Sequence, residues 1–162
     1  MEIRSIRRKD YKEVEQVIRQ SFSSSEHGYG NEAELVENIR TEHSYVEGLE
    51  VVATEGARII GYGLLSEVEI INAKESFTGL VLAPLAVLPS WQGKKVGEKL
   101  LKELEKRAVQ QEFPYISILG HPQYYSRFGY VPAEKYKVTA PFEVPAEAFM
   151  IRPLQADALK NV

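Results

Sequence analysis

The pattern of hydrophobic and polar positions predicts a strand followed by two helices at the start of the chain. Residues 2–7 alternate polar and apolar side chains, which is typical of a short strand with one buried face. After Asp10, apolar residues recur at helical spacing, so a helix with one face toward the core is expected. Glu13 stands three positions after Asp10, as in a capping box. A serine- and glycine-rich loop at 21–30 then precedes a second helix predicted over 31–40.

The middle of the chain has the pattern of consecutive strands. The apolar runs 51–54 and 58–65 flank Gly56, and we predict a β-hairpin with this glycine in its turn. Residues 78–87 are nearly all apolar, which is typical of a strand buried on both faces. Pro84 interrupts this run. Because proline has no N–H to donate, a bulge or a break in strand pairing is expected there.

The remaining elements continue this mixture of helices and strands. A helix is predicted with one apolar face made by Val96, Leu100, Leu104 and Ala108. Residues 115–119 form the next expected strand. Pro122 suits the first position of a short helix, and Gly129 suits the residue just past its end. Two more strands are predicted, at 136–139 and 149–154.

Composition and charge narrow the function classes. The 162 residues are 44% hydrophobic and 27% charged, which fits one globular domain over residues 1–162. A net charge of −3 gives no support to nucleic-acid binding. No apolar run approaches the roughly 20 residues of a membrane span, and no leader pattern opens the chain, so we expect a cytoplasmic protein without a membrane partner. The predicted succession of strands and helices is typical of a mixed α/β fold.

Cysteine and histidine usage excludes several kinds of site. The chain has no cysteine, which excludes disulfides, thiolate metal sites and a cysteine acyl-enzyme. His43 and His121 have no partners at a spacing that indicates a metal site or a catalytic triad. No metal is therefore expected.

Candidate chemistry concentrates in residues 84–101. An apolar run ends at Val87, a turn with a proline and glycine follows, and a helix then begins. The first turn of a helix has unpaired N–H groups and a partial positive charge, which is an arrangement that binds phosphates. Lys94 and Lys95 add full positive charges at the same place. We therefore predict a phosphate-binding site on the backbone amides of 93–98.

Two motifs resemble a known family. Val87–Pro89 and Gln92–Gly97 are similar to the V-x-P and Q/R-x-x-G-x-G/A acyl-CoA motif of the GNAT superfamily of N-acetyltransferases. Residues 120–130, GHPQYYSRFGY, resemble the tyrosine-bearing helix that follows in this superfamily. Their H-P-x-Y-Y-x-R-F-G-Y motif is similar to that of a small bacterial subgroup. Lys95 departs from the pattern, which has glycine at that position.

The resemblance implies a GNAT-like acyl-CoA N-acyltransferase fold, with a central, mostly antiparallel sheet flanked by helices. In this fold the strand 78–87 bulges and splays from its neighbour. Unpaired backbone groups of Leu85, Ala86 and Val87 would bind the acyl-pantetheine. The implied pyrophosphate site consists of Gln92, Gly93, Lys94, Lys95, Val96, Gly97 and Glu98. Tyr125 would be the general acid that protonates the departing CoA thiolate. The implied reaction is acetyl-CoA-dependent acetylation of a primary amine, in a small molecule or peptide, by direct attack in a ternary complex.

Several alternatives stay open at the level of sequence. Tyr125 could instead be a core aromatic beside Tyr124 and Phe128. Residues 78–89 hold no carboxylate, so a general base would be a water relay or one of Glu67, Glu69, Glu26, His27 and Glu32. A non-catalytic acyl-CoA-binding regulatory module is the main rival function. A nucleotide-phosphate protein is weaker, because the P-loop and G-x-G-x-x-G patterns are absent. The amine acceptor and the oligomeric state, a homodimer included, are not specified.

Overall fold

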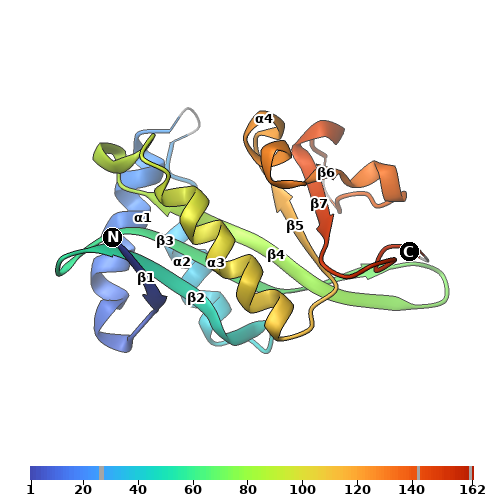
Figure 1. Ribbon diagram of the computed structural model, residues 1–162, viewed down its shortest axis with the longest axis horizontal. Coiled ribbons are helices and arrows are strands. Elements are labelled where there is room, and N and C mark those ends of the chain that lie inside the picture. The colour runs from blue at the N-terminus through green and yellow to red at the C-terminus, as the bar shows by residue number, and fades with distance from the viewer. Residues whose placement is uncertain (26–27, 142, 161) are drawn as a thin grey trace. The chain divides into compact units, whose positions relative to one another are not determined.

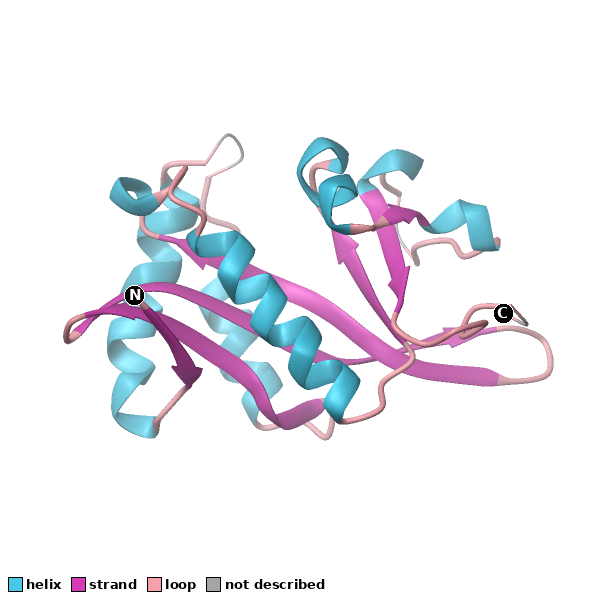
Figure 2. Ribbon diagram, in the orientation of Figure 1, coloured by secondary structure: helices cyan, strands magenta, loops and turns pink. Residues whose placement is uncertain are grey.

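Seven strands and four α-helices make up the computed structural model, which describes residues 1–25, 28–141, 143–160 and 162 (Figures 1 and 2). The strands are β1 (Glu2–Ser5), β2 (Tyr45–Glu55), β3 (Arg58–Ile71), β4 (Ser76–Val87), β5 (Tyr115–Leu119), β6 (Val131–Pro132) and β7 (Phe149–Pro153). The helices are α1 (Tyr11–Ser23), α2 (Glu32–Arg40), α3 (Val96–Gln110) and α4 (Pro122–Tyr125). None of the helices in the described ranges is long and apolar enough to cross a membrane.

The strand order is β1-β2-β3-β4-β5-β7-β6. β4 and β5 run parallel, whereas β1–β2, β2–β3, β5–β7 and β6–β7 are antiparallel. This confirms the predicted mixed α/β fold with a mostly antiparallel sheet. The chain forms two compact units, one made of residues 1–66 and 83–107 and the other of residues 67–82 and 108–162.

In the first unit, α3 lies on one face of the strands, and α1 and α2 lie on the other (Figure 1). Two glycines of β3 bring α3 close. A Cβ on Gly61 would stand 2.9 Å from side-chain carbons of Val96 and Leu100, and a Cβ on Gly63 would stand 2.9 Å from Leu104. Real Cβ atoms are not found this near to other heavy atoms. The missing side chains therefore let α3 pack directly on β3, which fixes where the helix begins.

The opposite face of the first unit holds a buried charged group. Glu50 is 1% exposed, and its carboxylate accepts hydrogen bonds from the hydroxyls of Tyr62 at 2.6 Å and Tyr45 at 2.8 Å. The Nε of Arg40, at the end of α2, donates to the same carboxylate at 2.8 Å. The Arg40 guanidinium also lies 3.8 Å from the ring centre of Tyr11. These bonds satisfy the buried charge and tie α2 to the sheet.

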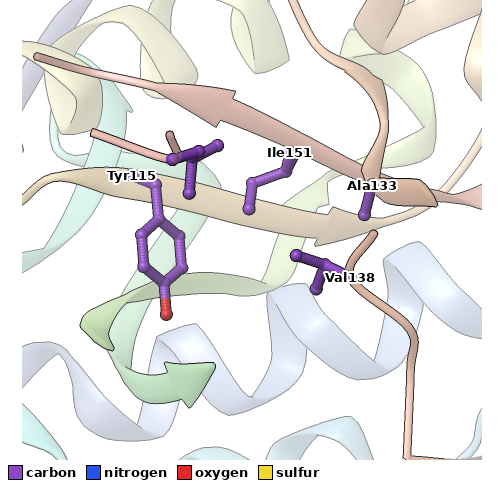
Figure 3. Packing of buried hydrophobic residues seen from close by; sticks show 5 residues of the cluster. Tyr115, Ala133, Val138 and Ile151 are labelled. Atoms are coloured by element: carbon purple, nitrogen blue, oxygen red, sulfur yellow. The ribbon is translucent and has the colours of Figure 1, made fainter. Parts of the chain in front are cut away.

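The second unit has a hydrophobic cluster of its own, shown in Figure 3. Its buried residues are Tyr115, Ala133, Val138, Ile151 and Leu159. The Tyr115 hydroxyl donates to the carbonyl of Phe77 at 2.8 Å. A Cβ on Gly79 would stand 2.4 Å from the Tyr115 ring, so this glycine leaves the space that the ring fills.

The strand predicted over 136–139 is wrong. The structure has a short 3-10 helix at Ala133–Tyr136, followed by a turn in which Lys137 adopts a φ of 62°. The N–H groups of Lys137 and Val138 donate back to Glu134 and Ala133. Alanine, glutamate and lysine favour helical over extended backbone, and this local preference overrides the strand propensity of the tyrosine and valine.

Two other details differ from the sequence analysis. The side chains of β4 from Leu80 to Val87 mostly alternate between buried and half-buried, so this part of the strand has one fully covered face instead of two. Glu13 does not close a capping box with Asp10, because its carboxylate accepts the N–H of Ile59 at 2.8 Å. Asp10 instead pairs with Arg4 at 2.7 Å.

Candidate functional site

The end of β4 leads directly into the start of α3. After Val87 the chain makes a 3-10 turn at Pro89–Trp91, and α3 begins at Val96. The N–H of Leu88 donates to the carbonyl of Ile60 on β3 at 2.9 Å, and the N–H of Trp91 donates to the carbonyl of Leu88 at 2.8 Å. These bonds hold the turn against the sheet.

Helix geometry makes the first turn of α3 a hydrogen-bond donor. The N–H of Lys99 donates to the carbonyl of Lys95 at 3.1 Å. The preceding N–H groups, of Val96, Gly97 and Glu98, have no acceptor within the helix. The Glu98 carboxylate is drawn to Lys102 one turn further on, at 3.4 Å. The helix terminus thus offers donors and partial positive charge to an anion.

The two lysines of the turn are exposed, and their backbone explains the sequence pattern. Lys94 lies with its Nζ 5.0 Å from the ring centre of Trp91. Gly93 has a φ of 78° and Lys95 has a φ of 67°, both in the left-handed region. Glycine is favoured in that region because it has no Cβ. Lys95 therefore keeps the backbone conformation that suits glycine while adding a charged side chain.

The pairing of β4 with β5 ends just before Pro84. The parallel pairs with β5 run from Leu80–Ile116 to Leu82–Ile118, and Pro84 follows two residues later. Proline has no N–H for a further ladder bond. Backbone polar groups alternate in direction along a strand, and the N–H of Leu88 points to β3. On this alternation the backbone N–H and C=O groups of Ala86 also point toward β3, whereas those of Leu85 and Val87 point toward the opposite edge of β4.

The backbone groups of Val87 are not unpaired, which corrects the expectation from sequence. Its N–H donates to the Oγ of Ser21 at 3.2 Å, and its carbonyl accepts a hydrogen bond from the Nε2 of Gln92 at 3.1 Å. Sequence reasoning missed Ser21, which lies 66 positions away and is 8% exposed. The one available signal was a polar residue on the buried face of α1, in register with Val14, Val17 and Ile18.

Tyr125 belongs to the second unit, where it ends α4. The sequence forms this helix as predicted, from Pro122 onward, and Gly129 adopts a φ of 92° after it. The Tyr125 ring meets Tyr124 edge-on at 5.0 Å and Tyr130 at 6.0 Å between ring centres. Burial, with a smaller contribution from Tyr124, raises the pKa of the Tyr125 phenol above its ordinary value.

The candidate bases stay unassigned. Glu67 is half-buried and Glu69 is exposed, both on β3. The Glu32 carboxylate accepts the N–H of Gly30 at 2.8 Å. Glu26 and His27 lie outside the described residues. Within the described part of the chain, no group of three or more histidine, cysteine, aspartate or glutamate side chains could hold a metal ion.

The chain is similar to known proteins in sequence. The family model for the acetyltransferase (GNAT) domain matches residues 47–132. The uncharacterized N-acetyltransferase YhbS of Escherichia coli is 31% identical over 92% of this chain and 84% of its own length.

Solved structures are also similar. A crystal structure of YhbS from Escherichia coli in complex with CoA has a TM-score of 0.87 and 28% identity, covering 99% of this chain and 85% of that one. A GNAT family acetyltransferase from Brucella melitensis in complex with acetyl-CoA has a TM-score of 0.75 and 27% identity, covering 94% of this chain and 86% of that one.

The left-handed backbone of Lys95 generates a stability prediction. Replacing Lys95 with glycine should raise the free energy of unfolding by about 1 kcal/mol, because a Cβ in that region costs about 1–2 kcal/mol and glycine's freedom in the unfolded chain offsets part of the gain. Urea denaturation measures this. Lys95→Ala is the matched control, since it removes the charge but keeps the Cβ, and should change little. Equal stabilisation by both variants would assign the effect to charge repulsion instead.

Proposed function

Because the chain belongs to the GNAT family of N-acetyltransferases, we propose that it binds acetyl-CoA and transfers the acetyl group to the primary amine of a small molecule or peptide. The observation that carries the proposal is the start of α3, where amide donors follow a left-handed turn at the end of β4. Relatives whose structures contain CoA and acetyl-CoA support the choice of cosubstrate.

In this proposal the pyrophosphate of acetyl-CoA binds the amides of residues 93–98. The N–H groups of Val96, Gly97 and Glu98, which have no acceptor within the helix, supply hydrogen bonds, and the helix dipole supplies partial positive charge. Lys94 and Lys95 are exposed and can add charge from the solvent side. The Glu98 carboxylate lies 3.4 Å from the ammonium of Lys102, which offsets part of its negative charge.

The pantetheine of acetyl-CoA takes the edge of β4 formed by Leu85 and Val87. Its amides exchange hydrogen bonds with these backbone groups in the manner of an added strand. Because Ser21 and Gln92 already satisfy Val87, binding replaces two internal hydrogen bonds with two to the cosubstrate. The alternation of the strand favours Leu85 and Val87 over Ala86 for this role.

The proposed chemistry is direct attack of the neutral amine on the thioester carbonyl. A C–N bond forms, the C–S bond breaks, and the amine proton passes to water or to a base not yet identified. Tyr125 donates its phenol proton to the CoA sulfur and is reprotonated by solvent. Since burial raises its pKa above the ordinary value of a phenol, Tyr125 stays protonated at physiological pH and can act as an acid. Two features favour the alternative of a non-catalytic acyl-CoA-binding module. They are Lys95 at the family's glycine position and the lack of an assigned general base.

The role of Tyr125 predicts a specific kinetic loss. Tyr125→Phe removes only the hydroxyl, so kcat should fall by about 10²–10⁴-fold while the Kd for acetyl-CoA stays nearly unchanged. Thiol release is measured with the fastest acceptor from a panel of polyamines, amino acids, aminoglycosides and peptides. Tyr124→Phe is the control from the same helix and should keep its kcat. Wild-type turnover in Tyr125→Phe, where chemistry limits the rate, would end the assignment.

The internal bond to Val87 predicts a gain in affinity. Ser21→Ala removes the acceptor of the Val87 N–H, so acetyl-CoA no longer has to displace it. A hydrogen bond of this kind contributes about 0.5–1.5 kcal/mol, which corresponds to a Kd lower by roughly 2- to 10-fold. Titration calorimetry measures the change, with Ser25→Ala, an exposed serine of the following loop, as the unaffected control. Weaker binding in Ser21→Ala would show that Ser21 supports the cosubstrate instead.

The absence of cysteine predicts the kinetic order. Without a thiol to carry the acetyl group, both substrates should bind before any product leaves. Double-reciprocal plots at several acetyl-CoA concentrations should give intersecting lines. Parallel lines, the pattern of ping-pong turnover, would contradict direct attack.

A further inference from the structure

Gly120 lies directly after β5 and against the ring of Tyr125. A Cβ placed on Gly120 would stand 2.5 Å from Cε2 of Tyr125 and 3.1 Å from Cδ2. The backbone of Gly120 does not have a left-handed φ, so no conformational demand explains a glycine there. Its N–H donates to the carbonyl of Ala148 at 2.9 Å, which holds the backbone in place. We therefore attribute the glycine at position 120 to the space that the Tyr125 ring occupies.

The ring of Tyr125 is held by other neighbours as well. Tyr124 and Tyr130 meet it edge-on, with ring centres at 5.0 and 6.0 Å. Tyr130 is 1% exposed, and its N–H donates to the carbonyl of Tyr125 at 3.4 Å. Gly120, Tyr124 and Tyr130 lie around the Tyr125 ring, and we call the space between them, which the ring fills, the slot. The position of the phenol oxygen is therefore set by the walls of this slot.

We propose that Gly120 is a positioning residue for Tyr125: its missing side chain lets the ring lie where the hydroxyl can reach the leaving thiolate. The inference rests on the proposed role of Tyr125 as the general acid. Proton transfer needs a donor and acceptor within about 2.6–3.2 Å, and a misplacement of about 1 Å can lower a rate by about 10²-fold. A methyl group on Gly120 has to move the ring by an amount of this order.

Gly79 provides a matched comparison within the same unit. A Cβ on Gly79 would stand 2.4 Å from the ring of Tyr115, an equally close approach. Tyr115, however, is a core residue, 1% exposed, with its hydroxyl bonded to the Phe77 carbonyl. Gly79→Ala should therefore lower stability and leave the kcat of the folded protein unchanged. Gly120→Ala should lower kcat.

The test combines Gly120→Ala with Tyr125→Phe. Gly120→Ala should lower kcat by about 10- to 100-fold, with the Kd for acetyl-CoA within about twofold of wild type. In the Tyr125→Phe background the same change should cause no further loss, since the hydroxyl that it displaces is already absent. Thiol release and calorimetry supply the two measurements on the full chain.

Each outcome bears on a different claim. If Tyr125→Phe is impaired while Gly120→Ala keeps wild-type kcat, or loses as much in the Tyr125→Phe background as alone, the inference about Gly120 is overturned. If Tyr125→Phe turns over like wild type, the acid assignment fails and the inference fails with it. If Gly120→Ala does not fold, Tyr124→Leu tests the slot from the side of Tyr124, which is half-buried. Tyr124→Leu should lower kcat when Tyr125 is present and cause no further loss in the Tyr125→Phe background. An unchanged kcat in Tyr124→Leu would contradict the proposed role of the slot.

Discussion

The proposed cosubstrate site depends on the place where α3 begins. A helix leaves its first N–H groups unpaired wherever it starts, but they bind an anion well only if the terminus is held still. Here two glycines of β3 let α3 pack directly on the strand, and a hydrogen bond from Leu88 to Ile60 anchors the turn before it. The left-handed residues of that turn then direct the chain into the helix. The amide donors are fixed by packing, without any charged side chain.

A second constraint is that buried and half-buried polar backbone groups need hydrogen-bond partners. Val87 meets this need with two side chains, the hydroxyl of Ser21 and the amide of Gln92. In the proposed complex, the N–H and carbonyl of Val87 would bind the pantetheine in place of these two side chains. This view gives a structural role to a glutamine that the family pattern shares and to a serine that it does not include. In the second unit, Gly120 and the ring of Tyr124 likewise pack closely against Tyr125.

The strand–turn–helix of the cosubstrate site and the helix that carries Tyr125 were predictable from sequence, because proline, glycine and apolar spacing report local structure. The left-handed φ of Lys95 could be anticipated from the family's glycine. Ser21 could not be paired with Val87, since nothing in a periodic pattern reports a contact 66 positions apart. The sequence analysis placed Glu13 in a capping box with Asp10, because Asp10 is only three positions away. The actual partner of its carboxylate is the N–H of Ile59. The strand predicted at 136–139 failed where local helix preference competed with β propensity.

The central claim is that the amides at the start of α3 hold the pyrophosphate of acetyl-CoA. Amide chemical shifts of ¹⁵N-labelled protein during titration with CoA test it directly, with inorganic pyrophosphate as a fragment of the same anion. We expect saturable shifts that are largest for Gly93 to Glu98 with both ligands, and shifts at Val87 with CoA alone. Saturable shifts that leave Gly93 to Glu98 unmoved would contradict it.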